Sequence, residues 1–214
     1  MSNFKYYKPN TFPPIVKNLI IINVLVWIAQ LIFDKQYNLT GKLALYPIGT
    51  PEFKPYQIAT HMFTHAAYDP AGNIIFYHIL FNMFALWMFG KILENVWGGK
   101  RFLLFYLICG VGAAFTHLAV QYFTGSYSEA IGASGAIMGI FAAFGYLFPN
   151  TELFILFIPI PIKAKWAVIG MAAYDLFVGY YGDDNVAHFA HLGGALTGFI
   201  LVLIWNRTNR KKFY

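Results

Sequence analysis

The sequence predicts an all-α membrane protein whose helices cross the bilayer several times. Of its 214 residues, 58% are hydrophobic and only 11% are charged, whereas soluble domains carry about 25% charged residues. The apolar residues gather in six stretches, each near the roughly 20 residues that a helix needs to cross a bilayer. Lys and Arg are placed unevenly between the intervening loops, which orients the chain. The expected fold class is therefore a polytopic bundle of six transmembrane helices.

The first apolar stretch, residues 18–33, follows a polar segment, residues 1–17, that we expect in the cytosol. A basic segment before an apolar core is also typical of a signal peptide. The residues that follow are Asp34, Lys35 and Gln36, whereas a cleavage site requires small residues. We therefore expect a retained helix.

A long segment, residues 34–73, separates the first and second apolar stretches. It mixes aromatic, proline and polar residues, and this amphipathic composition predicts that it lies partly in the outer headgroup layer. His61 and His65 stand four residues apart in it, a spacing that places two side chains on one helix face. The sequence leaves the role of these two histidines open.

Five further apolar stretches complete the predicted six-helix domain, residues 18–206. They cover residues 74–93, 102–123, 133–148, 165–181 and 186–205. Another apolar piece, residues 153–162, is broken by Pro159 and Pro161, so we expect it at the membrane interface rather than across it. The chain closes with a basic tail, residues 207–214, that we expect in the cytosol.

The positive charges fix the direction of the bundle, because cytoplasmic loops carry an excess of Lys and Arg. With both termini in the cytoplasm, twelve of these residues lie inside and three lie outside; the outer ones are Lys35, Lys42 and Lys54. The net charge of +6 then marks a face that meets anionic lipid headgroups, and it does not indicate nucleic-acid binding. The compact chain favours a location in a bacterial inner membrane. We expect no cofactor.

Two stretches of small residues each carry one reactive side chain, Ser134 in the fourth apolar stretch and His191 in the sixth. Each reactive residue precedes a Gly-x-x-x-Gly pattern, which lets apolar helices approach closely. The glycines of the two patterns are Gly135, Gly139, Gly194 and Gly198. If these two helices pack on each other, Ser134 and His191 meet.

The predicted topology also places Ser134, His191, His78 and Asn82 at a similar depth in the outer half of the membrane. The fourth stretch has 16 residues, so it spans only about 24 Å as a helix, against a hydrocarbon core of about 30 Å. Ser134 is therefore expected below the outer surface. Irregular backbone is tolerated there only in protein or beside water, which predicts a small wet pocket open to the outside.

These residue types indicate a serine hydrolase. A serine hydroxyl becomes a useful nucleophile when a neighbouring base takes its proton, and His191 is the candidate base for Ser134. His78, Asn82 and the backbone N–H of Ser134 are candidate donors to the oxyanion of the tetrahedral intermediate. No acid is evidently placed to orient His191, so the sequence predicts a dyad rather than a triad. We interpret His117, His188 and Asp175 as structural.

At these residues the sequence resembles the rhomboid family of intramembrane serine proteases. The matching motifs are Gly132-Ala133-Ser134-Gly135, Ala190-His191-Leu192-Gly193-Gly194 and His78-Ile79-Leu80-Phe81-Asn82, in the family's order. The resemblance covers roughly residues 60–205.

The resemblance to this family implies regulated proteolysis of the transmembrane helices of other proteins near the outer surface, with Ser134 as nucleophile and His191 as base. His78 and Asn82 would be the oxyanion donors. The fifth span and residues 181–185 would form a mobile gate. Met138 departs from the family, whose well-studied members carry an aromatic residue there, and we expect its sulfur to pack on the imidazole instead.

Three other functions compete with this interpretation. A metal-dependent hydrolase could use His61, His65, His188 and His191, although the sequence has no H-E-x-x-H motif. An aspartyl protease needs two carboxylates on facing helices. The two candidate acids here are Asp175, in the fifth span, and Asp183, in the turn after it, so they do not face each other from two helices. A non-catalytic membrane chaperone is disfavoured because both Ser134 and His191 are present.

Overall fold

A computed structural model describes residues 9–154, 160–182 and 186–208 of the chain. Within these residues, four helices are long and apolar enough to cross a membrane: α1 (Pro14–Tyr37), α4 (Tyr77–Trp97), α5 (Gly99–Thr124) and α8 (His188–Thr208). Two further helices complete the bundle, the short apolar α6 (Ser134–Leu147) and the 18-residue α7 (Ala164–Tyr181). The protein is thus an all-α polytopic membrane protein, and the count of six spans stays a prediction.

Each of the six predicted stretches falls on one of these helices, with differences at the ends. α1 begins four residues before the predicted span and ends four residues after it. The early start is possible because a proline at the first helical position is already in helical geometry. α8 begins at His188, two residues later than predicted. Parts of the predicted N-terminal segment, interfacial piece, gate and basic tail lie outside the described residues.

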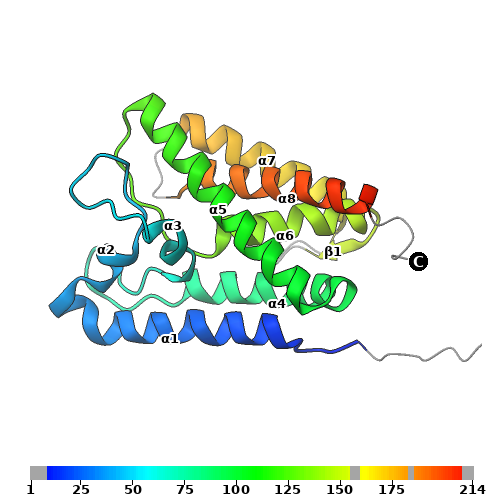
Figure 1. Cartoon of the computed structure of the whole chain (residues 1–214), viewed down its shortest axis with the longest axis horizontal. Coiled ribbons are helices and arrows are strands. Elements are labelled where there is room, and N and C mark those ends of the chain that lie inside the picture. The colour runs from blue at the N-terminus through cyan, green and yellow to red at the C-terminus, as the bar shows by residue number, and fades with distance from the viewer. Residues whose placement is uncertain (1–8, 155–159, 183–185, 209–214) are drawn as a thin grey trace, which may run out of the picture.

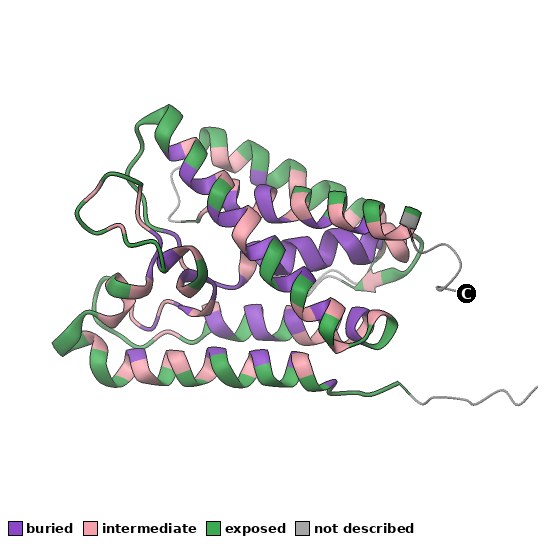
Figure 2. Cartoon of the chain, viewed as in Figure 1, coloured by how far each residue is buried: buried purple, intermediate pink, exposed green. Residues whose placement is uncertain are grey.

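The helices are arranged around α6, which runs through the middle of the bundle (Figure 1). α5 and α8 pack on α6 and on each other, α1 packs beside α4, and α7 packs on α8. Residues 135–145 of α6 are all buried, whereas much of α1 faces outward (Figure 2). The helix that carries Ser134 is therefore enclosed by protein, and the lipid-facing area belongs to the outer helices.

The contact between α6 and α8 depends on glycine. A Cβ atom added at Gly194 would overlap the carbonyl oxygen of Gly135, and one added at Gly198 would lie 2.5 Å from that of Gly139. Real side chains do not come this close to backbone, so each site has room for a hydrogen atom only. The two helices consequently touch backbone to backbone, as small residues permit in membranes.

A buried carboxylate ties α1 to α4. The first amide groups of a helix have no partner inside the helix. Glu94, near the end of α4, accepts hydrogen bonds from the backbone N–H groups of Ile15 at 2.9 Å and Val16 at 2.8 Å. Its negative charge also lies at the positive end of the α1 dipole, which is a favourable interaction. This tie fixes the height of α1 relative to α4.

The segment between α1 and α4 is more ordered than a simple loop. It contains α2 (Leu39–Leu43), α3 (Gln57–Thr60) and the short 3-10 helix η1 (His61–Phe63). The predicted interfacial piece is bounded by two strands, β1 (Glu152–Phe154) and β2 (Pro161–Lys163), which pair antiparallel with Leu153 opposite Ile162. A proline is accepted at the first residue of a strand, so Pro161 does not prevent this pairing.

The glycine contact generates a test of the packing. Gly194→Ala should lower the apparent melting temperature of the detergent-solubilised protein, because overpacking typically costs about 1–3 kcal/mol. Gly170→Ala in α7 is the matched control, since a Cβ atom there meets nothing within 4 Å. It should preserve or raise the melting temperature, because alanine is favoured over glycine in helices by about 1 kcal/mol. Equal melting temperatures for the two variants would contradict the close α6–α8 contact.

Candidate active site

Ser134 and His191 lie in hydrogen-bond contact. Ser134 is the first residue of α6, and His191 lies in the first turn of α8. The Ser134 Oγ atom is 2.8 Å from the Nε2 atom of His191. The glycine-mediated approach of α6 and α8 is what brings the two residues, 57 positions apart in the chain, to this distance.

Asp175 of α7 lies on the other side of the imidazole. Its Oδ1 atom is 3.1 Å from Nδ1 of His191 and 2.7 Å from Nδ1 of His188, and the residue is only 1% exposed. The expectation that no acid is placed beside His191 is therefore corrected, whereas the predicted dyad and the structural interpretation of Asp175 stay predictions. A carboxylate inside an apolar helix was itself the available signal, because such residues are rarely kept without a function.

The hydrogen bonds fix the protonation pattern of this group. An ionised Asp175 can only accept, so the Nδ1–H group of His191 donates to it. The Nε2 atom of His191 then has a lone pair that accepts the hydroxyl proton of Ser134. This order of acid, imidazole and hydroxyl is the arrangement that activates a serine nucleophile.

His78 presents a proton toward the same place. The backbone N–H of Ala66 donates to its Nδ1 atom at 3.2 Å, so the neutral ring carries its proton on Nε2. That Nε2 atom would lie 3.0 Å from a Cβ atom at Gly132. Gly132 also has a φ of +117°, a conformation that favours glycine. Position 132 therefore excludes a side chain both by backbone conformation and by the nearness of His78.

Asn82 lies one turn after His78 and is buried. Its Nδ2 atom donates to the backbone carbonyl of His78 at 2.8 Å, which uses one of the two amide protons. Its Oδ1 atom has no hydrogen-bond partner among the described residues. One amide proton of Asn82 is thus left for a further acceptor.

The loop before Ser134 is held by His61 and His65, whose role the sequence left open. The N–H of Gly132 donates to the carbonyl oxygen of His61 at 2.9 Å, and that of Ala133 donates to Nε2 of His65 at 3.4 Å. Burial lowers the pKa of His65 to about 3 and that of His61 to about 4. Both rings are therefore neutral at physiological pH, and only a neutral His65 can accept the proton of Ala133.

A glutamine of α1 supports His65 in turn. The Gln30 side chain donates to the carbonyl oxygen of His65 at 2.7 Å and accepts from its N–H at 3.2 Å. Gln30 is fully buried, so these bonds give its amide group the partners that water would give at the surface. Leu45 and Ala130 form an isolated antiparallel bridge nearby, which gives the loop a second attachment.

The remaining predicted site residues lie in or beside α6. Gly135 faces the side chain of Ala113 and Gly139 that of Cys109, both in α5. Met138 follows Ser134 by one turn and is buried in the main hydrophobic cluster. Its contact with the imidazole stays a prediction.

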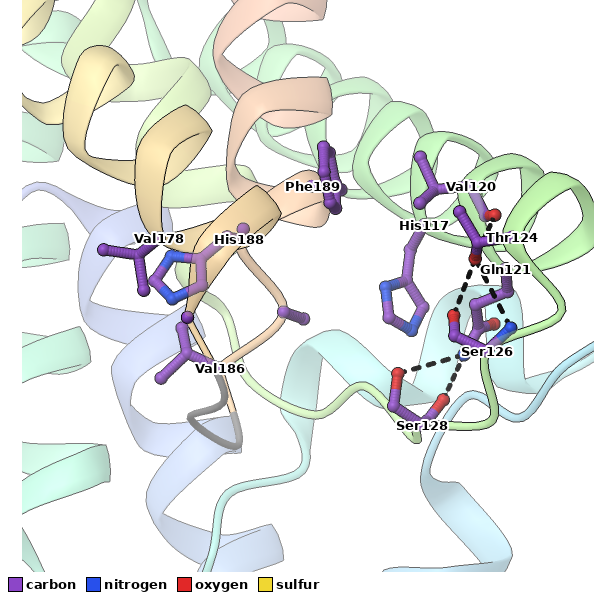
Figure 3. Close-up of a pocket in the computed structure, with 13 residues that line it drawn as sticks. His117, Val120, Gln121, Thr124, Ser126, Ser128, Val178, Val186, His188 and Phe189 are labelled. Atoms are coloured by element: carbon purple, nitrogen blue, oxygen red, sulfur yellow. Dashed lines mark hydrogen bonds between the residues drawn. The ribbon is translucent and has the colours of Figure 1, made fainter.

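A cavity of about 330 Å³ lies beside this group, between the end of α5 and the start of α8. Figure 3 shows His188 and His117 on opposite sides of it, with Ser126 and Ser128 of the loop after α5 at another wall. The metal-ligand set suggested by the sequence is not the one assembled here. Among the described residues, the ligand atoms that cluster belong to Asp175, His188 and His191, without His61 or His65.

Comparisons with known proteins agree with this architecture. Residues 52–208 match the family model described as Rhomboid domain. The human mitochondrial presenilin-associated rhomboid-like protein (Homo sapiens) is 31% identical over 199 residues, which cover 89% of this chain and 49% of the relative. The rat protein of the same name (Rattus norvegicus) is 36% identical over 194 residues, covering 80% of this chain and 51% of the relative.

A chloroplast relative extends the comparison. Rhomboid-like protein 11, chloroplastic, of Arabidopsis thaliana is 30% identical over 199 residues, which cover 88% of this chain and 64% of the relative. The chain spans about half the length of the two mitochondrial relatives. Because the matched family model covers well over half of the chain, the chain belongs to the rhomboid family.

Proposed function

We propose that this chain is an intramembrane serine endopeptidase that cleaves transmembrane segments of other membrane proteins near the outer face. The observation that carries the proposal is the 2.8 Å hydrogen bond between Ser134 Oγ and His191 Nε2. This pair lies inside a polytopic helical bundle of the rhomboid family. A packing serine has no need of an imidazole whose far nitrogen faces a buried carboxylate.

The reaction follows from the protonation pattern. Ser134 Oγ attacks the scissile carbonyl carbon while His191 Nε2 takes the hydroxyl proton, and Asp175 stabilises the imidazolium that results. The tetrahedral intermediate collapses when His191 gives that proton to the leaving amine, which leaves an acyl-enzyme ester. Water, deprotonated by His191, then hydrolyses the ester and restores the serine.

Three donors support the developing oxyanion in this proposal. The Nε2–H of His78 lies beside Gly132, and the second amide proton of Asn82 is unused within the described residues. The backbone N–H of Ser134 is at the start of α6, where amide groups lack intrahelical partners and the helix dipole favours negative charge. Such donors act strongly because they are fixed before the reaction and point to where negative charge develops.

The substrate class follows from the location of the site. A membrane-embedded serine meets transmembrane helices, whose carbonyl groups are already hydrogen-bonded. Small or helix-breaking residues near the outer surface free such a carbonyl most easily, so we expect cleavage there. α7 is the proposed gate, because it packs on one edge of the bundle and exposes large apolar side chains such as Phe177 and Tyr180. No cofactor takes part.

The protein is a multi-pass membrane protein, and its partners in this proposal are the bilayer and its transmembrane substrates. The names of the relatives place those proteins in mitochondria or chloroplasts. The predicted bacterial inner membrane, with both termini cytoplasmic, draws no support from these names and stays a prediction.

A fluorophosphonate probe tests the serine assignment directly, because it reacts covalently with an activated serine. In detergent, the wild-type protein should be labelled, whereas Ser134→Ala and His191→Ala should not. Ser126→Ala is the matched control, since Ser126 is an exposed serine of the preceding loop, and it should be labelled like the wild type. Labelling of Ser134→Ala at the wild-type level would refute the proposal.

Asp175→Asn tests the third member of the group. Without the carboxylate, the imidazole loses the partner that holds its proton on Nδ1, so kcat should fall by at least about 10-fold and at most about 10⁴-fold, with little change in KM. The measurement is cleavage of a transmembrane peptide in liposomes over a range of pH. Asp69→Asn, in an exposed loop, is the control and should retain activity. An unchanged kcat for Asp175→Asn would show that Ser134 and His191 act without it.

A further inference from the structure

The group around His191 contains more ligand atoms than the hydrolase reaction uses. One ligand atom each from Asp175, His188 and His191 lie within 4.8 Å of one another. His188 and His191 stand three residues apart on α8, and Asp175 reaches them from α7. The Oδ2 atom of the buried Asp175 has no hydrogen-bond partner among the described residues. The carboxylate thus meets two imidazoles with Oδ1 and leaves Oδ2 buried and unpaired, which makes it an incomplete polar site.

The donor set and its spacing suit one class of ion. Two imidazoles and one carboxylate form a common protein ligand set for Zn²⁺, which binds such atoms at about 2.0–2.2 Å. In a tetrahedral site the ligand atoms would therefore be about 3.3 Å apart. The separations of 2.7 Å and 3.1 Å from the Asp175 oxygen would have to widen toward this value, and the two imidazoles, whose ligand atoms lie within 4.8 Å of each other, would close around the ion. Mg²⁺ and Ca²⁺ prefer all-oxygen sites and do not match.

We propose that Asp175, His188 and His191 bind a zinc-like divalent cation, and that the bound ion inhibits the enzyme. The ligand atoms would be Nδ1 of each histidine and a carboxylate oxygen of Asp175. The metal-binding half of this proposal stands on the cluster alone. The inhibitory half rests on the proposed serine-hydrolase function.

Inhibition follows from the position of one proton. In the active arrangement, His191 carries its proton on Nδ1 and accepts the Ser134 proton with Nε2. A cation needs the Nδ1 lone pair, so the proton of the neutral ring must leave Nδ1 and, through solvent, return on Nε2. The Nε2 atom is then a donor and can no longer take the proton of Ser134. The ion would thus remove the base while leaving the nucleophile in place.

An ion has a route to these atoms. His188 lines the 330 Å³ cavity at the loop end of α5, together with polar side chains such as Gln121 and Ser128 (Figure 3). The side chain of His191 is 18% exposed, whereas that of Asp175 is 2% exposed. The carboxylate is the least exposed of the three ligand groups, so an arriving cation would meet it last.

Binding is tested first, because it needs no catalysis. Titration of the detergent-solubilised full chain with Co²⁺ should give a visible absorption band of tetrahedral type that saturates at one Co²⁺ per protein. Zn²⁺ should displace the Co²⁺ and abolish the band, whereas Mg²⁺ should not. Ser134→Ala should bind in the same way. His188→Gln should bind more weakly by more than the roughly 10- to 100-fold that loss of an outer-shell partner costs.

His117→Gln is the matched control, since His117 lines the same cavity but is not part of the cluster, and it should bind like the wild type. Absence of the Co²⁺ band in the wild type, or equal affinity in His188→Gln, would overturn the site. Weakening by His117→Gln as large as that by His188→Gln would overturn the ligand set.

Inhibition is tested next, with each variant compared with its own metal-free rate. Zn²⁺ should inhibit peptide cleavage by the wild type and by His117→Gln, and a chelator should restore it. His188→Gln should need more Zn²⁺ by the same factor as in the binding test, more than roughly 10- to 100-fold. Loss of activity on chelation would overturn the inhibitory role and favour a metal-dependent hydrolase. A wild type that binds Co²⁺ yet never hydrolyses peptide or reacts with fluorophosphonate would support the metal site and refute the proposed function.

Discussion

The close approach of α6 and α8 is the constraint on which the site depends. Lipid offers no hydrophobic driving force between helices, so the two associate through packing of small residues. Gly194 and Gly198 lie against the carbonyl oxygens of Gly135 and Gly139, and nearer the start of both helices the same contact sets Ser134 against His191. A methyl group at Gly194 would separate the helices and lengthen this hydrogen bond. Packing and chemistry are therefore properties of one interface.

A second constraint is that polar groups inside the bundle must find partners in protein. The Oδ1 atom of Asp175 finds its partners in His188 and His191, and these bonds also hold α7 against α8. His65 does the same for the loop before Ser134, with Gln30 behind it. The polar residues that position the site are thus also those that attach α7 and the loop before Ser134 to the bundle.

The sequence predicted the features that depend on local pattern. Apolar stretches located the helices to within a few residues, and the two glycine patterns brought Ser134 and His191 together. It missed Asp175, because the rotation of α7 about its axis depends on packing that no local pattern records. It also missed His65 as a support of the loop, since that bond joins residues 68 positions apart.

The geometry of His191 also exposes a tension within the site. A carboxylate beside Nδ1 makes the imidazole a better base, because it stabilises the charge formed during proton transfer. Adding His188 to the same Asp175 oxygen steadies a carboxylate that is nearly excluded from water. Asp175, His188 and His191 together have the composition that a zinc-like cation also favours. A site organised to hold one positive charge at this nitrogen therefore selects poorly between a proton and a metal ion, and the ambient metal concentration decides which one occupies it.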